Sequence, residues 1–275
     1  MAHQHYVSKF LTKPWERRRG RVLVYYDFQR DRIEEAKARD LFAQTDLHSA
    51  DIERRLHELI EDPLGRLWHR VRKEGIKPIT DPREVRAAHL VFLTQACRFI
   101  DQSTHASTVE RKLVDVLGRD DAYLDALVSL QVNDYDLRVF SMPKDDRSKV
   151  EFLFYPQTGV IGFPVLEDPA KKVLASVTVA LGIPLHPQIL LAAVPKTVLE
   201  PWLAQVQPMF QAFSLGLTDE CRKVVIPATV ADRYDRAELV ARIKILRALA
   251  KEVVPLMTRM KEIVVDAHRL VGLTT

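Results

Sequence analysis

The spacing of apolar residues predicts a run of helices in the first half of the chain. From residue 49 onward, apolar side chains recur every three or four positions, an interval that places them on one helix face. Ser49 is suited to cap the first helix. Asp62 with Pro63 predicts the start of a second helix, and Gly75 its end. Asp81 opens a capping-box-like segment, and further helices are predicted over residues 82–100, 106–117 and 121–133.

The pattern changes to strands at two places. Residues 21–28 are rich in β-branched and aromatic side chains and predict a strand. Two structures are open for the next segment, because residues 32–43 have the composition of a helix whereas a turn at 29–31 would give a hairpin over 22–37. In the middle of the chain, short apolar runs predict strands at residues 137–141, 150–155, 160–165, 176–179 and 189–191.

The uncharged segment 173–195 is long enough to cross a membrane. Two prolines, Pro184 and Pro187, interrupt it, so two buried strands joined by a turn over 183–187 explain it better. Taken together, the elements predict an α+β fold with a helical first half, a mixed or antiparallel central sheet and a long C-terminal helix. We expect a single domain over residues 1–275, with subregions that are helical at about 46–135, strand-rich at about 137–195 and again helical at about 196–275.

The C-terminal helix carries a heptad-like apolar stripe from Leu239 to Val271. Additional leucines widen the stripe, and Pro255 should kink the helix. Packing on the protein's own core is therefore favoured, and a homo-oligomer formed through this helix is the less favoured alternative.

Composition adds limits on compartment and partners. Of the 275 residues, 47% are hydrophobic and 28% are charged, which is typical of a globular protein. Cys97 and Cys221 form no CxxC pair, and no apolar leader is evident, so we expect reduced thiols in a cytoplasmic protein without a membrane partner. The first 21 residues hold six Lys and Arg against one acid, Glu16. This basic loop either binds phosphates or is simply solvated.

The opening residues combine polar chemistry with apolar anchors, which predicts that this terminus is docked on the domain. His3 and His5 would share one face of a strand and could hold a metal, or could form a hydrogen-bonded pair. If residues 22–37 form a hairpin, Asp27 could face Glu35 and Lys37, the acid and lysine pattern of magnesium-dependent nucleases. The alternative is that these are ordinary surface charges.

Two further groups are candidates for a site. Gln95 and Arg98 lie three residues apart on one predicted helix, where they would either bind an anion or join a structural network. Glu167 and Asp168 follow a predicted strand, a common place for active-site carboxylates, although Asp-Pro also starts ordinary loops. His57 and Glu61 only approximate a zinc-protease motif and are interpreted as a charged helix face.

Several short motifs occur in a fixed order between residues 3 and 195: His5-Tyr6-Val7, Val24-Tyr25-Tyr26-Asp27, Gln95 with Arg98, and Pro184-Leu185-His186-Pro187. In these motifs the chain resembles a widespread microbial family known only as a domain of unknown function, whose members begin with His-Tyr-Val-Pro. Ser8 replaces the proline of that signature. The family's Ser-Asp-Asn-Pro turn corresponds here to Leu166-Glu167-Asp168-Pro169, a departure that weakens any inherited role for Asp168.

The resemblance implies a hairpin over 22–37 and a bacterial or phage-encoded cytosolic protein, because some relatives are single-gene antiphage defence factors. We therefore expect an effector that acts on nucleic acid or nucleotides, with a divalent metal such as magnesium as a candidate cofactor. The alternative is a non-catalytic binding or sensor protein. The expected site gathers catalytic and anion-binding residues. The catalytic group is His5, Tyr6, Glu167 and Asp168, with His5 transferring a proton, and the anion-binding group is Lys9, Gln95 and Arg98.

Overall fold

The computed structural model describes residues 3–5, 7–17, 19–45, 48–98, 106–141, 155–156, 161–166, 177–197, 222–245 and 247–248. The helical elements are α1 (Lys9–Thr12), the 3₁₀ turn η1 (Lys13–Trp15), α2 (Ala38–Phe42), α3 (Ala50–Leu56), the π-helical turn η2 (His57–Glu61), α4 (Asp62–Glu74), α5 (Pro82–Arg98), α6 (Ala106–Leu117), α7 (Asp121–Asp134) and α10 (Ala228–Ala231). The strands are β1 (His3–His5), β2 (Leu23–Asp27), β3 (Arg32–Ala36), β4 (Ala43–Thr45), β5 (Tyr135–Ser141), β6 (Tyr155–Pro156), β7 (Ile161–Leu166), β8 (Val177–His186), β9 (Ile189–Pro195) and β10 (Lys223–Ile226).

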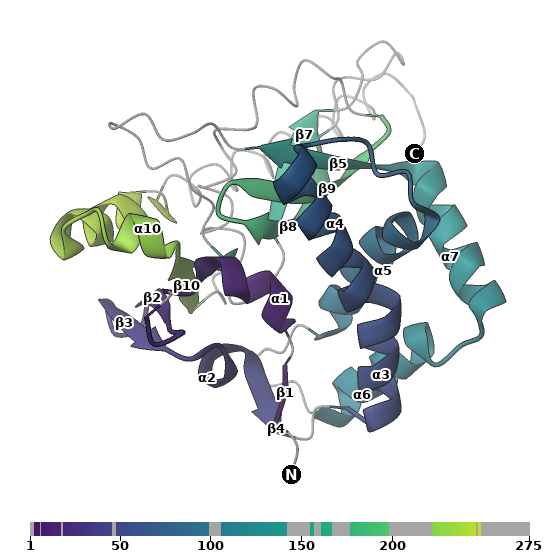
Figure 1. Cartoon of the computed structure of the whole chain (residues 1–275), viewed down its shortest axis with the longest axis horizontal. Coiled ribbons are helices and arrows are strands. Elements are labelled where there is room, and N and C mark those ends of the chain that lie inside the picture. Colours follow the sequence, from purple (N-terminus) through teal and green to yellow (C-terminus); the bar gives the residue numbers. More distant parts are fainter. Residues whose placement is uncertain are drawn as a thin grey trace, which may run out of the picture.

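The described strands form small antiparallel sheets, which confirms the predicted α+β class. One sheet has the order β3-β2-β10-β6, a second has the order β5-β9-β8-β7, and β1 pairs with β4 alone. Helices α3 to α7 lie on one side of the molecule and the β2–β3 pair on the other, with α1 between them (Figure 1). Helix α1 is thus flanked by later parts of the chain.

Residues 22–37 form the hairpin, not the helix. Leu23 pairs with Ala36 and Asp27 pairs with Arg32, so the turn lies at residues 28–31. The strand β10 then adds to the other edge of β2. The hairpin gains its stability from this partner nearly 200 residues away in sequence, which local composition could not indicate.

The segment from residue 50 to residue 74 is helical throughout and differs from the two separate helices that we predicted. Ser49 caps it as expected, since its Oγ accepts the N–H of Ile52 at 3.4 Å. Asp62 begins α4 as predicted, but α4 follows η2 without a break, because the Asp62 N–H bonds to the carbonyl of His57 and so closes a π-turn. Pro63 lies in the first turn of α4, where the missing N–H of proline is tolerated.

Gly75 ends α4, as predicted, and its backbone explains why glycine stands there. Its φ of 81° and ψ of −176° fall in a region that other residues rarely adopt. Its N–H bonds to the carbonyl of Val71 at 3.0 Å. The helix therefore stops through a conformation that only a residue without Cβ adopts cheaply.

Two alanine substitutions in and beside α4 should have opposite effects on the free energy of unfolding. Gly75→Ala should lower it by about 2 kcal/mol, because of backbone strain alone; a Cβ there would have no heavy atom within 4 Å. Gly65→Ala, also with open space around its Cβ, should raise it by about 0.5–1 kcal/mol because it lies in the helix interior. Urea unfolding of both variants checks this, and equal effects of the same sign would contradict it.

The start of α5 differs from the expected capping box. Asp81 caps the helix by accepting the N–H of Arg83 at 2.8 Å. Glu84 does not reach back toward it. Instead the buried Glu84 side chain pairs with Arg70 of α4. This ion pair ties two neighbouring helices together and raises the pKa of Arg70, chiefly through the hydrogen bond from its guanidinium to Glu84.

The strands β8 and β9 form the hairpin predicted for the uncharged segment, but the turn is shorter. Pro184 and His186 belong to β8, with an irregular register between them, and only residues 187–188 form the turn. No helix in the part of the chain that the structure describes is both long enough and apolar enough to span a bilayer.

The structure describes only the beginning of the apolar stripe that was predicted from Leu239 to Val271. Residues 236–245 are helical. Leu239 and Ile243, its first two positions, are buried with Val24, Tyr26 and Val224 of the β2–β10 sheet. This contact agrees with packing on the protein's own core, whereas the rest of the predicted stripe, including Pro255, lies outside the described residues.

Candidate functional site

The opening segment is docked on the domain, as the sequence predicts. Val7, Leu11 and Trp15 are at most 1% exposed and belong to the main hydrophobic core. Beside them, the buried Ser8 donates from Oγ to Oε1 of Glu61 in η2. The N-terminal segment is therefore held both by apolar packing and by a polar contact to the π-turn.

The predicted catalytic and anion-binding residues are only partly placed. The backbone of His5 lies in β1 opposite Ala43. Lys9 is exposed on α1, Gln95 is buried in α5 with 2% exposure, and Arg98 is the last residue of α5. The candidates Tyr6, Glu167 and Asp168 lie outside the described residues, so the gathering of this set around one cleft stays a prediction.

The magnesium-nuclease arrangement on the hairpin is excluded by the register. Glu35 pairs with Val24, three residues before Asp27 along β2. Since successive side chains of a strand point to opposite faces, Glu35 and Asp27 lie on opposite faces of the sheet. Asp27 instead accepts the N–H groups of Gln29 and Arg30 at 2.9 and 3.0 Å, which makes it a turn-forming residue.

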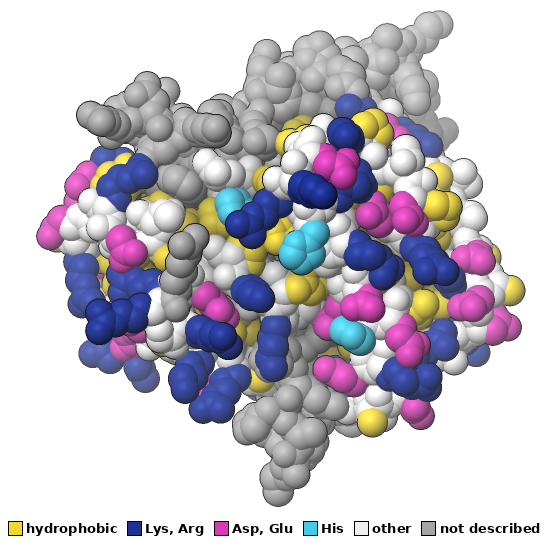
Figure 2. All heavy atoms as spheres, viewed as in Figure 1, with side chains coloured by type: hydrophobic (Ala, Val, Ile, Leu, Met, Phe, Trp, Pro, Cys, Tyr) yellow, Lys and Arg dark blue, Asp and Glu magenta, His cyan; other side chains and the backbone are white. Residues whose placement is uncertain are grey.

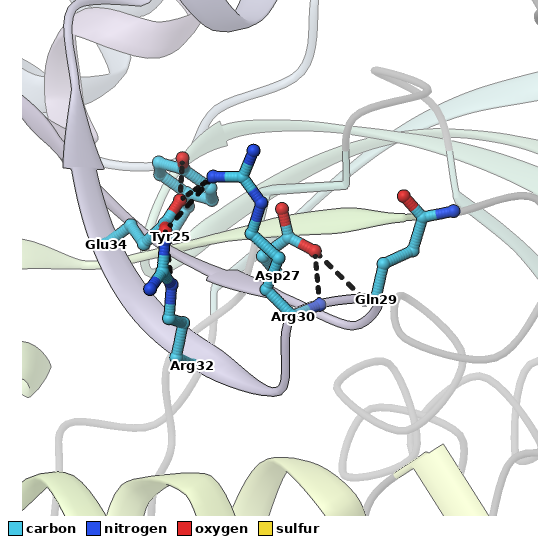
Figure 3. Close-up of polar contacts among 6 residues, drawn as sticks. All are labelled: Tyr25, Asp27, Gln29, Arg30, Arg32 and Glu34. Atoms are coloured by element: carbon cyan, nitrogen blue, oxygen red, sulfur yellow. Dashed lines mark hydrogen bonds and ion pairs between the residues drawn. The ribbon is translucent and has the colours of Figure 1, made fainter.

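A polar cluster does occupy the Asp27 face of the hairpin, with Glu34 at its centre (Figure 3). Glu34 accepts the Tyr25 hydroxyl at 2.6 Å and pairs with Arg30 and Arg32. The Tyr25 hydrogen bond, together with these arginines, lowers the pKa of Glu34 to about 2. Burial, followed by the bond to Glu34, raises the pKa of Tyr25 to about 12.

This cluster links the two strands of the hairpin, because Tyr25 belongs to β2 and Glu34 to β3. With pKa values near 2 and 12, neither Glu34 nor Tyr25 exchanges a proton near neutral pH, as general acid–base catalysis would require. Arg30 and Arg32 both form ion pairs with Glu34, and Asp27 and Asp31 add two further negative charges at the tip. At the tip of the hairpin, the positive charge is therefore compensated within the protein.

Positive charge is in excess at the opposite, open end of the hairpin. The pairing of Leu23 with Ala36 brings Arg21, two residues before Leu23, and Lys37, directly after Ala36, to the same end of the sheet. Arg19 lies in the same turn as Arg21, and Lys13 and Arg21 both lie close enough to Glu16 to oppose the rise in its pKa caused by burial. We call Lys13, Arg19, Arg21 and Lys37 the basic end.

The charge of the basic end is exposed. All four side chains are exposed, and none forms an ion pair with an acid of the described residues. Arg17 differs, because it pairs with Glu35 and Asp232. In the space-filling view, dark blue side chains crowd the area where β2, β3 and α2 lie (Figure 2). Residues 9–39 hold ten Lys and Arg against five Asp and Glu, a surplus of +5, while the whole chain has +4.

A half-buried histidine lies elsewhere, at the end of β8. The ring of His186 stacks on Trp68 of α4, with centroids 5.0 Å apart and planes inclined by 24°. Its Nδ1 accepts the N–H of Gln188 at 3.2 Å. Burial, with a smaller effect of the Arg72 charge, lowers the pKa of His186 to about 4. This histidine is therefore neutral at physiological pH.

Metal ligands do not converge among the residues that the structure places: within them, no group of three or more His, Cys, Asp or Glu could hold an ion. Neither family models, nor curated proteins, nor solved structures give a match to this chain. The resemblance based on the His5-Tyr6-Val7 signature consequently stays a prediction that rests on its motifs.

Proposed function

We propose that the protein is a nucleic-acid-directed effector of bacterial antiphage defence, and that the basic end holds the phosphate backbone. The defence role rests on the resemblance in sequence alone. The observation that supports nucleic acid as the ligand is the separation of charge on the hairpin. At its tip, Arg30 and Arg32 pair with Glu34 beside two further acids, Asp27 and Asp31, whereas the cations at its open end face solvent and form no ion pair among the described residues.

A polyanion suits this surface better than a small anion does. The basic end belongs to η1, to the turn before β2 and to the residue after β3, and its members are spread over a surface rather than turned into a cavity. Lys and Arg spread in this way contact successive phosphates and release their counterions, so affinity depends steeply on salt.

The test is the salt dependence of binding to short single-stranded and double-stranded oligonucleotides, measured by fluorescence anisotropy. The test variant carries Arg19→Gln, Arg21→Gln and Lys37→Gln. If each side chain contacts one phosphate, the slope of log K against log salt should become shallower by about 2–3. An unchanged slope and affinity in this variant would remove the basic end from the proposal.

A matched control removes the same charge elsewhere. Lys73, Arg111 and Lys112 are exposed cations on α4 and α6, and their triple exchange for glutamine should leave the slope unchanged. If the control and test variants lose the same affinity for the oligonucleotide, binding depends on the net charge of the protein and not on the position of the basic end.

The second candidate function is non-catalytic binding or sensing. It is favoured by the opposite orientation of Asp27 and Glu35, which removes the one nuclease arrangement that we predicted on the hairpin. Incubation with RNA and DNA, with and without magnesium, separates the two functions. Cleavage by the wild type that His5→Ala abolishes at an unchanged melting temperature supports the effector; binding without cleavage supports the sensor.

A further inference from the structure

A hollow of about 280 Å³ lies where the π-turn η2 and the beginning of α4 meet the beginning of α5. Its two sides come from elements that pack closely on one another. Leu59 and Pro63 supply apolar surface, and Pro63 is buried. The hollow shares no residue with the basic end.

Arginines line one part of this hollow. Arg66 comes from α4, and Arg83 and Arg86 come from α5. Arg86 is held by Asp121 and Asp125 at 3.0 and 3.4 Å. Arg66 and Arg83 are exposed and form no ion pair with an acid of the described residues. Two guanidinium groups thus remain available for an anion, and their planar forks match phosphate oxygens.

Carboxylates line the hollow as well. Glu58 and Asp62 are both exposed and belong to the helical segment that contains the π-turn. Carboxylates of this kind accept hydrogen bonds from sugar hydroxyls, as they do in dinucleotide-binding folds. A π-turn within a helix is uncommon and often accompanies a functional site.

We propose that this hollow binds a nucleoside monophosphate. Arg66 and Arg83 bind its phosphate, and Glu58 and Asp62 accept hydrogen bonds from its ribose hydroxyls. The apolar surface of Leu59 and Pro63 contacts the planar base. The volume is near the lower limit of small-molecule sites, which suits a mononucleotide rather than a larger ligand. This site does not depend on nucleic acid binding at the basic end.

Calorimetric titration of the full chain with adenosine monophosphate tests the proposal, with inorganic phosphate and adenosine as comparison ligands. We expect one site with a Kd tighter than about 1 mM for the nucleotide and weaker binding of either fragment. Arg66→Gln with Arg83→Gln should weaken nucleotide binding at least about tenfold, through loss of two charge-assisted contacts. Equal affinity for phosphate and nucleotide, or no nucleotide binding, would overturn it.

Two further variants identify the contacts. The double exchange Glu58→Gln and Asp62→Asn should weaken the binding of adenosine monophosphate, because the contacts to the ribose are lost. The binding of inorganic phosphate should be unchanged or tighter. The exchange of Arg111 and Lys112 for glutamine is the charge-matched control and should change nothing. If it weakens nucleotide binding as much as the Arg66 and Arg83 exchange, the hollow is not the site.

The triple variant of the basic end distinguishes this proposal from the proposed function. It should bind adenosine monophosphate like the wild type, even where oligonucleotide binding is lost. Loss of nucleotide binding in that variant would place the nucleotide at the basic end and overturn the assignment to the hollow.

Discussion

Replacement of Trp15 by alanine should lower the free energy of unfolding by about 3–5 kcal/mol, the usual loss for a large aromatic side chain removed from a core. Trp15 is fully buried and packs in the cluster that also contains Leu11 of α1. Both the lost burial and the cavity left behind contribute. Urea unfolding followed by circular dichroism measures the change.

The control for this variant is Leu130→Ala on α7, because Leu130 is 65% exposed. It should change stability by less than about 0.5 kcal/mol. The comparison also tests the docked N-terminal segment. A loss below about 1 kcal/mol for Trp15→Ala would mean that residues 7–15 contribute little to the core, contrary to the burial of their apolar side chains.

Acidification should destabilise the protein through His186. The folded state lowers the pKa of this imidazole from 6.5 to about 4, so below pH 6.5 the unfolded chain binds the proton more readily. Stability from this group is therefore complete above pH 6.5 and is lost as the pH falls toward 4. The full effect is up to about 3 kcal/mol, at about 1.4 kcal/mol for each pKa unit.

The hydrogen bonding of His186 also favours a lowered pKa. Nδ1 of His186 accepts the Gln188 N–H, so a proton added to Nδ1 would face a donor and break that bond. His186→Asn keeps an acceptor but does not titrate in this range. The measurement is the free energy of unfolding of both proteins between pH 4 and 7. Their difference should shrink as the pH falls, whereas parallel curves would show that the pKa of His186 is not lowered by folding.

Local signals in the sequence predicted the helices well. Ser49 and Gly75 mark the ends of the segment over 50–74 because capping depends on a few neighbouring residues. The π-turn at 57–61 was not predicted, since its residues have ordinary helical spacing. The choice between hairpin and helix for residues 32–43 also could not be made from composition, because pairing with the distant β10 decides it.

The candidate sites depended even more on long-range structure. The basic loop was visible as a run of charges, but Lys37 joins it only through the pairing of Leu23 with Ala36. The sequence did not indicate that Arg66 and Arg83 line one hollow, because they are 17 residues apart in the sequence and come together only where two helices pack. The opposite faces of Asp27 and Glu35 result from a register that composition does not reveal.

The position of β3 at the end of its sheet has a consequence for solubility. An edge strand offers unpaired backbone groups to which another chain can add, and charged side chains on that strand discourage such addition. Along β3, Arg32, Glu34 and Glu35 provide these charges. Arg32 and Glu34 also pair with each other at the tip of the hairpin, and Glu35 pairs with Arg17. The charges along β3 therefore also protect the protein against edge-to-edge aggregation, and neutralising them together would expose a template for strand addition.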